Sequence, residues 1–290
     1  MPHALTILPL RAALAAFRLA QPDLPGPAGS ALRRAAMLSL SPEERRAEVA
    51  IDALRRRLRQ SAECVEVVDY GAGTRGGARP PVRDVSDVYR AAATGPAWGR
   101  FLFGLARGLQ PRRVLELGTN LGVGAAHLAA ALALTEEEGG PAGRLVTLEG
   151  APALATLASG ALARLGHSVG ADACRVRVVV GPFAETLPGV GEGGPFDLVF
   201  IDGHHQAEAA LDYLDTLRPM LAQGAVVVLD DVEPGRPVRQ AWTRLRSISP
   251  QPAFYAGKYG LWVAPGGGAA TADARESPSH PPAAAGRPSD

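Results

Sequence analysis

The sequence is poor in aromatic residues and cysteines and has almost no lysine. Aromatic side chains make up 5% of its 290 residues, whereas hydrophobic residues as a whole make up 47%. A core of ordinary size therefore has to be built mainly from alanine, leucine and valine. Lys258 is the only lysine, which fits a GC-rich coding bias alongside the many alanines, glycines, prolines and arginines. We treat this composition as background and look for function in the order of the residues.

The charge balance and the two cysteines exclude further classes of protein. The formal net charge is +1, so the sequence does not favour a polyanionic partner such as a nucleic acid. The densest basic run, Arg55–Arg57 with Arg59, is typical of the solvated face of a helix. Cys64 and Cys174 have neither metal-ligand spacing nor a CxxC pattern, which indicates unpaired thiols in a reducing compartment.

No segment of the sequence is typical of a membrane protein or of a secreted one. The apolar stretch Ala4–Leu19 is interrupted by Pro9 and Arg11 and has no basic region ahead of it, so we do not interpret it as a signal peptide. No run is long and apolar enough to span a bilayer. We therefore expect a cytoplasmic protein without a membrane partner.

The pattern of residues divides the chain into three parts. Residues 1–84 are expected to form a helical and irregular N-terminal extension, residues 85–265 the main domain, and residues 266–290 a disordered tail. The tail is rich in Gly, Ala, Pro and Ser and cannot bury enough apolar surface to offset its ordering entropy. Within the extension we expect these features: a short helix at Ala12–Leu19, a break at Pro22–Gly29, a helix from the cap Ser41 to about Gln60, and a strand at Cys64–Tyr70.

The main domain alternates short apolar strands with apolar-periodic helices. After helical runs in Ser86–Leu109, strands are expected at Arg113–Leu117, Arg144–Leu148, Arg175–Val180, Phe196–Ile201 and Ala225–Leu229, with closing strands at Phe254–Tyr255 and Gly260–Ala264. Helices are expected at Gly122–Leu134, Ala151–Leu165, Ala207–Leu221 and Pro237–Ser247. This alternation predicts an α/β fold of the Rossmann-like type, a mostly parallel sheet with helices on both faces.

The strongest local signal is the segment Val114–Gly124, in which an apolar strand ends in an acid, turns through glycines and enters a helix. Ligands of parallel sheets bind beyond the carboxyl ends of the strands, and Gly118 and Gly122 allow a close approach to the backbone. The glycine spacing is not GxGxxG, which disfavours a dinucleotide site and a nicotinamide-dependent oxidoreductase. Glu116 would repel a pyrophosphate and would favour a cationic sulfonium ligand that also carries an ammonium group.

Three later strands also end in acids, which the fold would bring to the same edge. Glu149 follows the next strand and could accept both hydroxyls of a ribose. Asp202 follows a buried strand and leads into His204 and His205, either of which could act as a base or a metal ligand. The pair Asp230–Asp231 closes another strand. Together, Asp202, Asp230 and Asp231 could form an oxygen-rich Mg²⁺ site, or the pair could cap a hydrated turn.

Taken in order, these motifs resemble class I S-adenosylmethionine-dependent methyltransferases of the O-methyltransferase-like kind, the methyltransferase domain 24 group. The resemblance runs from about Asp84 to Pro265. It rests on Leu-Glu-Leu-Gly-Thr-x-x-Gly, on Glu149, on Phe-Asp-Leu-Val-Phe-Ile-Asp-Gly-x-His and on Val-Leu-Asp-Asp-Val. The upstream stretch Val68–Thr74 is similar to a Gly-rich segment of some bacterial members, but no regular βα repeat follows it. The resemblance implies a seven-stranded sheet whose last hairpin is reversed.

The resemblance also implies a cofactor, S-adenosylmethionine, and roles for particular residues. Glu149 would hold the ribose, Phe183 would pack on the adenine, and Asp202 would lie close to the methyl group. The full set of expected cofactor residues is Glu116, Gly118, Thr119, Asn120, Gly122, Glu149, Phe183 and Asp202. Two departures from the family pattern stand out. First, Pro182 stands where related sequences often carry an acid in the adenine loop. Second, the metal-dependent branch has an Asp-Asn pair where this chain has Asp230-Asp231, and a lysine where this chain has Gly203-His204-His205. Metal dependence is therefore not carried over.

Methyl transfer needs an aligned acceptor and removal of the acceptor proton. We expect His205 to be the base, with His204 as second choice, and Asp202 and Asp230 to orient the acceptor directly or through Mg²⁺. The acceptor is expected to be a small-molecule hydroxyl, with Tyr89 and Trp98 as candidate walls of its site or as ordinary core residues. Protein or RNA methylation, non-catalytic binding of S-adenosylmethionine or a related nucleoside, and a homodimeric assembly stay open.

Overall fold

The computed structural model describes residues 26–37, 39–68, 81–171, 174–248 and 253–265. The expected helix at Ala12–Leu19, most of the stretch Val68–Thr74 and the tail 266–290 lie outside these ranges. Within them, no helix combines the length and the apolar character that crossing a bilayer would require. Cys64 and Cys174 are both free thiols, as expected.

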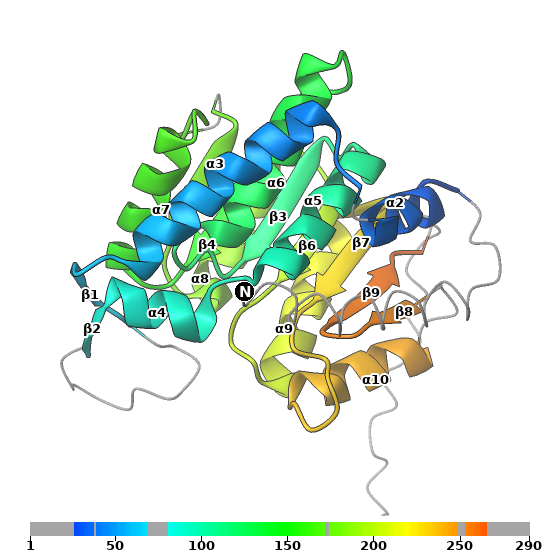
Figure 1. Cartoon of the computed structure of the whole chain (residues 1–290). Coiled ribbons are helices and arrows are strands. Elements are labelled where there is room, and N and C mark those ends of the chain that lie inside the picture. The colour runs from blue at the N-terminus through cyan, green and yellow to red at the C-terminus, as the bar shows by residue number, and fades with distance from the viewer. Residues whose placement is uncertain (1–25, 38, 69–80, 172–173, 249–252, 266–290) are drawn as a thin grey trace, which may run out of the picture.

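A seven-stranded sheet forms the centre of the molecule (Figure 1). Its strand order is β5-β4-β3-β6-β7-β9-β8, and β9 runs antiparallel to both of its neighbours while the other pairings are parallel. The strands are β3 Arg113–Leu117, β4 Arg144–Glu149, β5 Val176–Val180, β6 Phe196–Ile201, β7 Leu221–Leu229, β8 Ala253–Ala256 and β9 Tyr259–Val263. The Rossmann-like α/β fold, the seven strands and the reversed last hairpin are thus confirmed.

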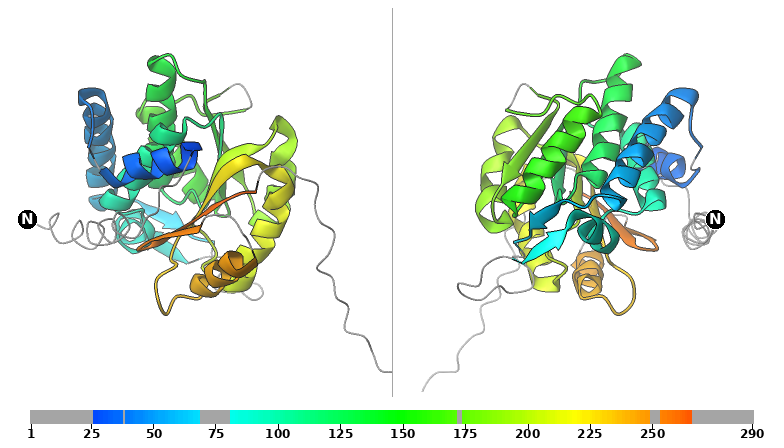
Figure 2. Two further views of the ribbon diagram at one scale, coloured as in Figure 1. Left: turned by 90° about the vertical axis from the view of Figure 1, so that its right-hand side faces the viewer. Right: turned by 60° about the vertical axis from the view of Figure 1, so that its left-hand side comes forward.

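Helices cover both faces of this sheet (Figures 1 and 2). One face is covered by α5 Pro96–Leu109, α6 Val123–Glu137 and α7 Pro152–Arg164, with α2 Gly26–Met37, α3 Pro42–Arg59 and α4 Val85–Ala92 packed around them. The other face is covered by α8 Phe183–Thr186, α9 Ala207–Leu217, α10 Val238–Ile248 and the short 3₁₀ segments Leu187–Gly193 and Arg218–Met220. Each face buries its own hydrophobic cluster, because side chains alternate between the two faces along every strand.

Helix α6 is apolar on every side, because it lies between the sheet and α3. Eleven of its residues are buried, and no polar stripe interrupts its alanines and leucines. The N-terminus of this helix leads directly out of the glycine loop after β3. The packing of α6 therefore fixes the position of that loop relative to the sheet.

Helix α3 begins and ends where the sequence predicts. Ser41 is its N-cap, and its hydroxyl accepts a hydrogen bond from the Glu44 amide at 3.2 Å, while the Glu44 carboxylate accepts one from the Ser41 amide at 2.8 Å. This reciprocal capping box satisfies two amides that the first turn would otherwise leave free. The helix ends with Gln60 as its C-cap.

Three expectations for the chain path are wrong in detail. The break expected at Pro22–Gly29 does not extend beyond Gly26, where α2 begins, because proline is compatible with a first helical turn and Ala31 and Leu32 bury that helix against α5. The expected strand Cys64–Tyr70 is shorter, since β1 Cys64–Glu66 pairs with β2 Val82–Asp84 in a small separate sheet. Helix α9 ends four residues early, at Leu217, ahead of Pro219.

Arg55 does not belong to a solvated helix face, contrary to the sequence prediction. Its side chain is buried and Nη1 donates a hydrogen bond to the Thr94 carbonyl oxygen at 2.7 Å. Arg55 lies one turn after the buried Ile51 on α3, so it faces inward, whereas Arg56, Arg57 and Arg59 are exposed as expected. Because Thr94 is part of the cleft described next, this bond ties the N-terminal region to that cleft.

Candidate active site

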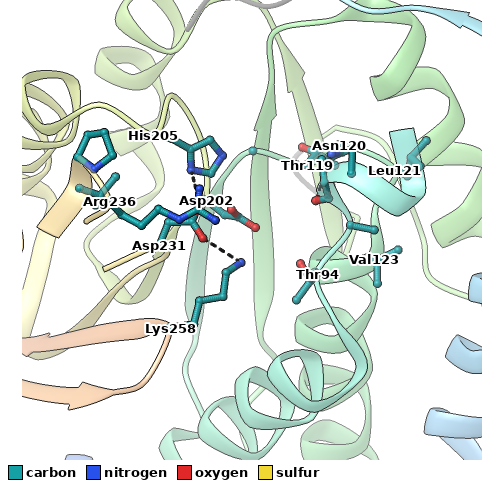
Figure 3. Close-up of a pocket in the computed structure, with 17 residues that line it drawn as sticks. Thr94, Thr119, Asn120, Leu121, Val123, Asp202, His205, Asp231, Arg236 and Lys258 are labelled. Atoms are coloured by element: carbon teal, nitrogen blue, oxygen red, sulfur yellow. Dashed lines mark hydrogen bonds and ion pairs between the residues drawn. The ribbon is translucent and has the colours of Figure 1, made fainter. Parts of the chain in front are cut away.

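A cleft of about 470 Å³ opens at the carboxyl edge of the sheet. We call one wall the loop side, made of Thr94, Gly118–Leu121, Val123 and Gly124. We call the opposite wall the charged side, made of Asp202, His205, Asp231, Arg236 and Lys258. Figure 3 shows the labelled side chains of the two walls facing each other across the opening. Ala91–Ala93, Pro237 and Val238 complete the lining.

Backbone hydrogen bonds hold the glycine loop against the end of β4 and the end of β3 against the residue that follows β6. Gly118 and Thr119 donate hydrogen bonds to the Leu148 carbonyl at 3.0 and 3.1 Å, and Asp202 donates from its amide to the Leu117 carbonyl at 2.8 Å. Gly118 has φ of +105°, and a Cβ atom there would overlap the Asp202 carbonyl oxygen. Only glycine fits this crossing, so the motif prediction for Gly118 has a structural reason.

Glu116 lies beneath the loop rather than on the cleft wall. It is the fourth residue of β3 and shares its face with Thr147 and Phe200, its partners in the register of the sheet. Thr147 donates its hydroxyl to Oε2 of Glu116 at 2.6 Å, and a Cβ on Gly124 would come within 2.5 Å of Oε1. The pKa of Glu116 is raised to about 8, mainly by burial and also by the nearby Glu149, although the hydrogen bond from Thr147 acts in the opposite direction. A contact between this carboxyl group and the cofactor stays a prediction.

Glu149 anchors the glycine loop to the end of β4. One carboxylate oxygen accepts a hydrogen bond from the Asn120 amide at 2.7 Å, and the other accepts one from the Ala151 amide at 2.9 Å. Burial raises its pKa, although the backbone donors of Ala151, Asn120 and Gly150 act in the opposite direction. The carboxylate is thus fixed at the strand tip where a ribose was predicted to bind, but it is outside the lining of the cleft.

Phe183 was expected to pack on an adenine ring. It begins α8, and its ring lies edge-on against Tyr213 with centroids 5.7 Å apart. It also covers Gly203, where a Cβ atom would come within 2.6 Å of the ring. Phe183 does not line the cleft, and its adenine contact remains a prediction.

Asp202, on the charged side, lies next to the buried Asp230. Burial raises the pKa of both groups, and the two carboxyl groups lie close enough to share a hydrogen bond. For Asp230 the negative charge of Asp202 raises the pKa further, while for both residues the positive charge of Lys258 lowers it. The two strand ends of β6 and β7 therefore bring together the acids that the sequence predicted to meet.

Lys258 joins this cluster from the turn between β8 and β9. Its Nζ lies 2.5 Å from Oδ2 of Asp230 and 3.4 Å from Oδ1 of Asp231. The pKa of Lys258 is raised because the attraction of Asp230 and Asp202 outweighs the effect of burial. From the sequence alone, the single lysine was interpreted as a result of composition. The signal that could have found it is its place in the closing hairpin, whose turn has to lie at the carboxyl edge.

The two histidines after β6 differ in position. His205 lines the cleft, and its Nδ1 lies 3.3 Å from Oδ2 of Asp231. His204 has a left-handed backbone with φ of +63°, and its Nδ1 lies 2.5 Å from the hydroxyl of Tyr213, outside the lining. The geometry therefore favours His205 over His204 as the group that can reach a bound acceptor.

The three acids proposed as metal ligands do not form an open ligand set. Oδ1 of Asp230 accepts a hydrogen bond from the Asp231 amide at 2.6 Å, and Oδ2 faces Lys258. Asp231 is shared between Lys258 and His205. In the part of the chain that the structure describes, no group of three or more His, Cys, Asp or Glu side chains is arranged to hold a metal ion. The donor set thus does not fit Mg²⁺.

Other side chains near the cleft fall into two groups. Tyr89 and Trp98, weighed as walls for the acceptor, are core residues. Tyr89 is buried, and Trp98 packs edge-on against Tyr259 with centroids 4.8 Å apart. Thr94 and Arg236 do line the cleft, but neither carried a sequence signal because both lie in irregular connections.

The chain was compared with known proteins by sequence and by structure. A family model described as a methyltransferase domain, Methyltransf_24, matches residues 115–232. This range begins in β3 and ends just after the Asp230-Asp231 pair. It therefore covers the glycine loop and, on the charged side, Asp202, His205 and Asp231, but not Arg236 or Lys258.

Two curated relatives are similar to about half of the chain. A catechol O-methyltransferase of Mycobacterium tuberculosis is 42% identical over 149 residues, which are 51% of this chain and 60% of the relative. A catechol O-methyltransferase of Niastella koreensis is 31% identical over 144 residues, which are 49% of this chain and 59% of the relative. The match thus spans about 60% of the length of these relatives.

A solved structure agrees with the fold. The SAH-bound methyltransferase PaMTH1 of Podospora anserina superimposes with a TM-score of 0.52 at 18% identity, covering 84% of this chain and 98% of PaMTH1. The family match and the two relatives agree with the motifs quoted from the sequence. Over residues 115–232 the chain is therefore similar to methyltransferases that carry this domain.

Proposed function

We propose that this protein transfers the methyl group of S-adenosylmethionine to a hydroxyl group of a small aromatic acceptor of the catechol type. The observation that carries the proposal is the cleft itself. The glycine loop of the methyltransferase domain faces a histidine–carboxylate pair across an opening of about 470 Å³. The names of the two curated relatives support a catechol as the acceptor.

The residues of the loop side are suited to hold the cofactor. Gly118 leaves the backbone uncovered, and Glu149 fixes the loop through the Asn120 amide. Glu149 also provides a carboxylate at the tip of β4, as the ribose hydroxyls require. When bound, S-adenosylmethionine supplies a methyl group on a positively charged sulfur, and Asp202 lines the same cleft, where an ionised carboxylate would favour that charge.

The charged side is suited to prepare the acceptor. Nδ1 of His205 faces Asp231, which leaves the other ring nitrogen able to accept the hydroxyl proton of an acceptor. Asp231 would orient the imidazole and stabilise its charged form once the proton has moved. The chain's task is then to align the acceptor oxygen and to take its proton, since the sulfonium group is already a good leaving group.

The size and lining of the cleft favour a small acceptor. Its volume lies within the range of about 300–1,000 Å³ that small-molecule sites occupy. Ala91–Ala93, Pro237 and Val238 give apolar surface for a ring, next to the polar groups of the charged side. A catechol presents both kinds of surface, an apolar ring and adjacent hydroxyl groups.

The proposal is tested with purified protein, S-adenosylmethionine and a panel of catechols, simple phenols and aliphatic alcohols. Calorimetry measures cofactor binding, and production of S-adenosylhomocysteine measures turnover. We expect binding, and turnover that is fastest with catechols. Absence of binding would refute the proposal, and binding without turnover of any hydroxyl compound would refute the transferase activity.

A matched pair of variants connects the result to the site. Glu149→Ala removes the carboxylate at the tip of β4 and is expected to weaken cofactor binding at least tenfold. Glu208→Ala removes an exposed carboxylate in the first turn of α9 and serves as the control. Equal binding by the two variants would contradict the role of Glu149.

A further inference from the structure

Lys258 occupies a fixed position at the carboxyl edge of the sheet. Strand β8 runs in the direction of β7, so the turn that joins β8 to β9 has to lie beside the end of β7. The Val232 amide donates a hydrogen bond to the Lys258 carbonyl at 3.0 Å, which ties this turn to the segment after β7. The single lysine of the chain is therefore held in place by its backbone, and its side chain lines the cleft.

The ammonium group of Lys258 faces the carboxylates that would otherwise be free to bind a cation. It contacts Asp230 at 2.5 Å and Asp231 at 3.4 Å, and the side chain is 25% exposed. The remaining oxygen of Asp230 accepts the Asp231 amide, and the remaining oxygen of Asp231 faces His205. A divalent cation placed among these acids would meet a positive charge already at contact distance from two of them.

We propose that the Lys258 ammonium takes the place of a divalent cation in this cleft, so that the protein needs no bound metal to hold the acceptor oxygen. This inference rests on the proposed function. As the hydroxyl proton passes to His205, the electron pair of the broken O–H bond stays on the acceptor oxygen. The ammonium group then faces that growing negative charge. A fixed cation of this kind stabilises the charge without reorganisation of water.

The charged side supports this role in two ways. Asp230 and Asp231 orient the ammonium group, and they balance its charge when no acceptor is present. The fixed turn keeps the Lys258 backbone beside the cleft, and the two ion pairs hold its ammonium group there. Lys258 thus resembles a metal ion in providing a positive charge at a set point, but it is part of the chain.

The first experiment uses the wild-type protein and does not depend on any variant folding. Binding of Mn²⁺ is measured by calorimetry and by electron paramagnetic resonance, and methyl transfer is measured in EDTA and then with added Mg²⁺. We expect no Mn²⁺ site with a Kd below about 1 mM, which corresponds to about 4 kcal/mol of binding free energy, and rates within twofold in EDTA and Mg²⁺. A tenfold loss of rate in EDTA that Mg²⁺ restores would overturn the proposal, as would micromolar binding of Mn²⁺ that Asp231→Asn removes.

The second experiment uses Lys258→Met, which keeps the length of the side chain but removes its charge. We expect kcat in EDTA to fall about 100-fold, the range seen when one group that stabilises an oxyanion is removed, with cofactor affinity changed less than threefold. Arg218→Met removes an exposed cation paired with Asp215 and is the control. Full activity of Lys258→Met in EDTA would overturn the proposal.

Two further measurements separate the possible causes of a loss. Lys258→Arg keeps the positive charge and is expected to retain activity in EDTA at least tenfold above that of Lys258→Met, and circular dichroism compares the folding of both variants. Failure of the wild type to methylate any acceptor, with or without metal, would refute the proposed function. The Mn²⁺ measurement would still decide whether Lys258 excludes a divalent cation.

Discussion

The loop side and the charged side of the cleft are built in different ways. The loop side depends on backbone: a glycine at φ +105°, amides bonded to Leu148, and an Asn120 amide held by Glu149. The charged side depends on side chains that arrive from three separate connections, after β6, after β7 and between β8 and β9. The loop side is therefore encoded in one short segment, whereas the charged side exists only after the sheet has formed.

This difference has a consequence for what each side tolerates. A backbone site is sensitive to the conformation that a residue can adopt and less sensitive to its side chain. A side-chain cluster is sensitive to charge and reach. Four substitutions test the comparison, ordered from the largest expected effect to the smallest.

The largest effect is expected from Gly118→Ala. The added Cβ would overlap the Asp202 carbonyl oxygen, and the positive φ alone costs on the order of 1–3 kcal/mol. Gly118 belongs to the loop side and Asp202 to the charged side, so this overlap would displace both sides of the cleft. We expect methyl transfer to fall about 1,000-fold and the protein to lose stability in urea. Gly139→Ala is the matched control, since Gly139 also has a positive φ, of +85°, but open space around its Cβ. Equal effects of the two variants would show that the close contact between Gly118 and the Asp202 carbonyl oxygen is unimportant.

His205→Gln tests the charged side. Removal of a general base typically lowers turnover by 10²–10⁴, so we expect kcat to fall about 100-fold while cofactor affinity changes less than threefold. His204→Gln is the control, because His204 contacts Tyr213 outside the cleft, and its kcat should fall less than tenfold. Production of S-adenosylhomocysteine at saturating cofactor and acceptor measures kcat of both variants. A larger loss in His204→Gln would reverse the assignment.

Glu116→Gln tests the buried acid beneath the loop through its pH dependence. The pKa of Glu116 is raised to about 8 in the folded protein, from an ordinary value of 4.5. Between these values the folded state holds a proton that the unfolded state has lost, so this group lowers the free energy of unfolding as pH rises. Its contribution has a maximum slope of about 1.4 kcal/mol per pH unit.

The neutral amide of Glu116→Gln should remove this slope. Urea unfolding at several pH values between about 5 and 8 measures the difference between the variant and the wild type. The variant should gain stability relative to the wild type toward pH 8. A constant difference across this range would show that Glu116 is ionised in the folded state.

The smallest effect is expected from Asn120→Gly. Asn120 has φ of +49°, which glycine adopts easily, and the amide that bonds to Glu149 is retained. We expect cofactor affinity to change less than threefold and the free energy of unfolding by less than about 1 kcal/mol. Asn120→Pro should instead abolish cofactor binding, because proline has no N–H and cannot adopt a positive φ. Similar behaviour of the two variants would contradict a backbone role for the loop.

The sequence predicts the fold and the loop side well, for a physical reason. Strand and helix periods are local, and the glycine loop is one continuous segment, so Gly118, Glu149 and the order of the βα units could be recognised without a structure. The orientation of Glu116 beneath the loop could not, since it depends on the register of β3 with β4. Its second-to-last place in an alternating strand was the available hint.

The charged side was only partly predictable. The acids at the ends of β6 and β7 were expected to meet, and the structure brings Asp202 and Asp230 together. Lys258 was missed because its partners are more than 20 residues away and become neighbours only through the reversed hairpin. Arg55 was misjudged for a similar reason, since its partner Thr94 lies 39 residues along the chain. Charges that pair across long distances in sequence leave no local pattern.

The single lysine, Lys258, also makes the cleft accessible to selective covalent labelling. Reagents that acylate amines have a single side-chain target in this sequence, and it sits at the mouth of the opening. Its carboxylate neighbours raise its pKa and keep it protonated, which slows acylation, so the rate of labelling would change with whatever binds beside the ammonium group. The same residue could therefore report occupancy by mass spectrometry, with no engineered probe added to the protein.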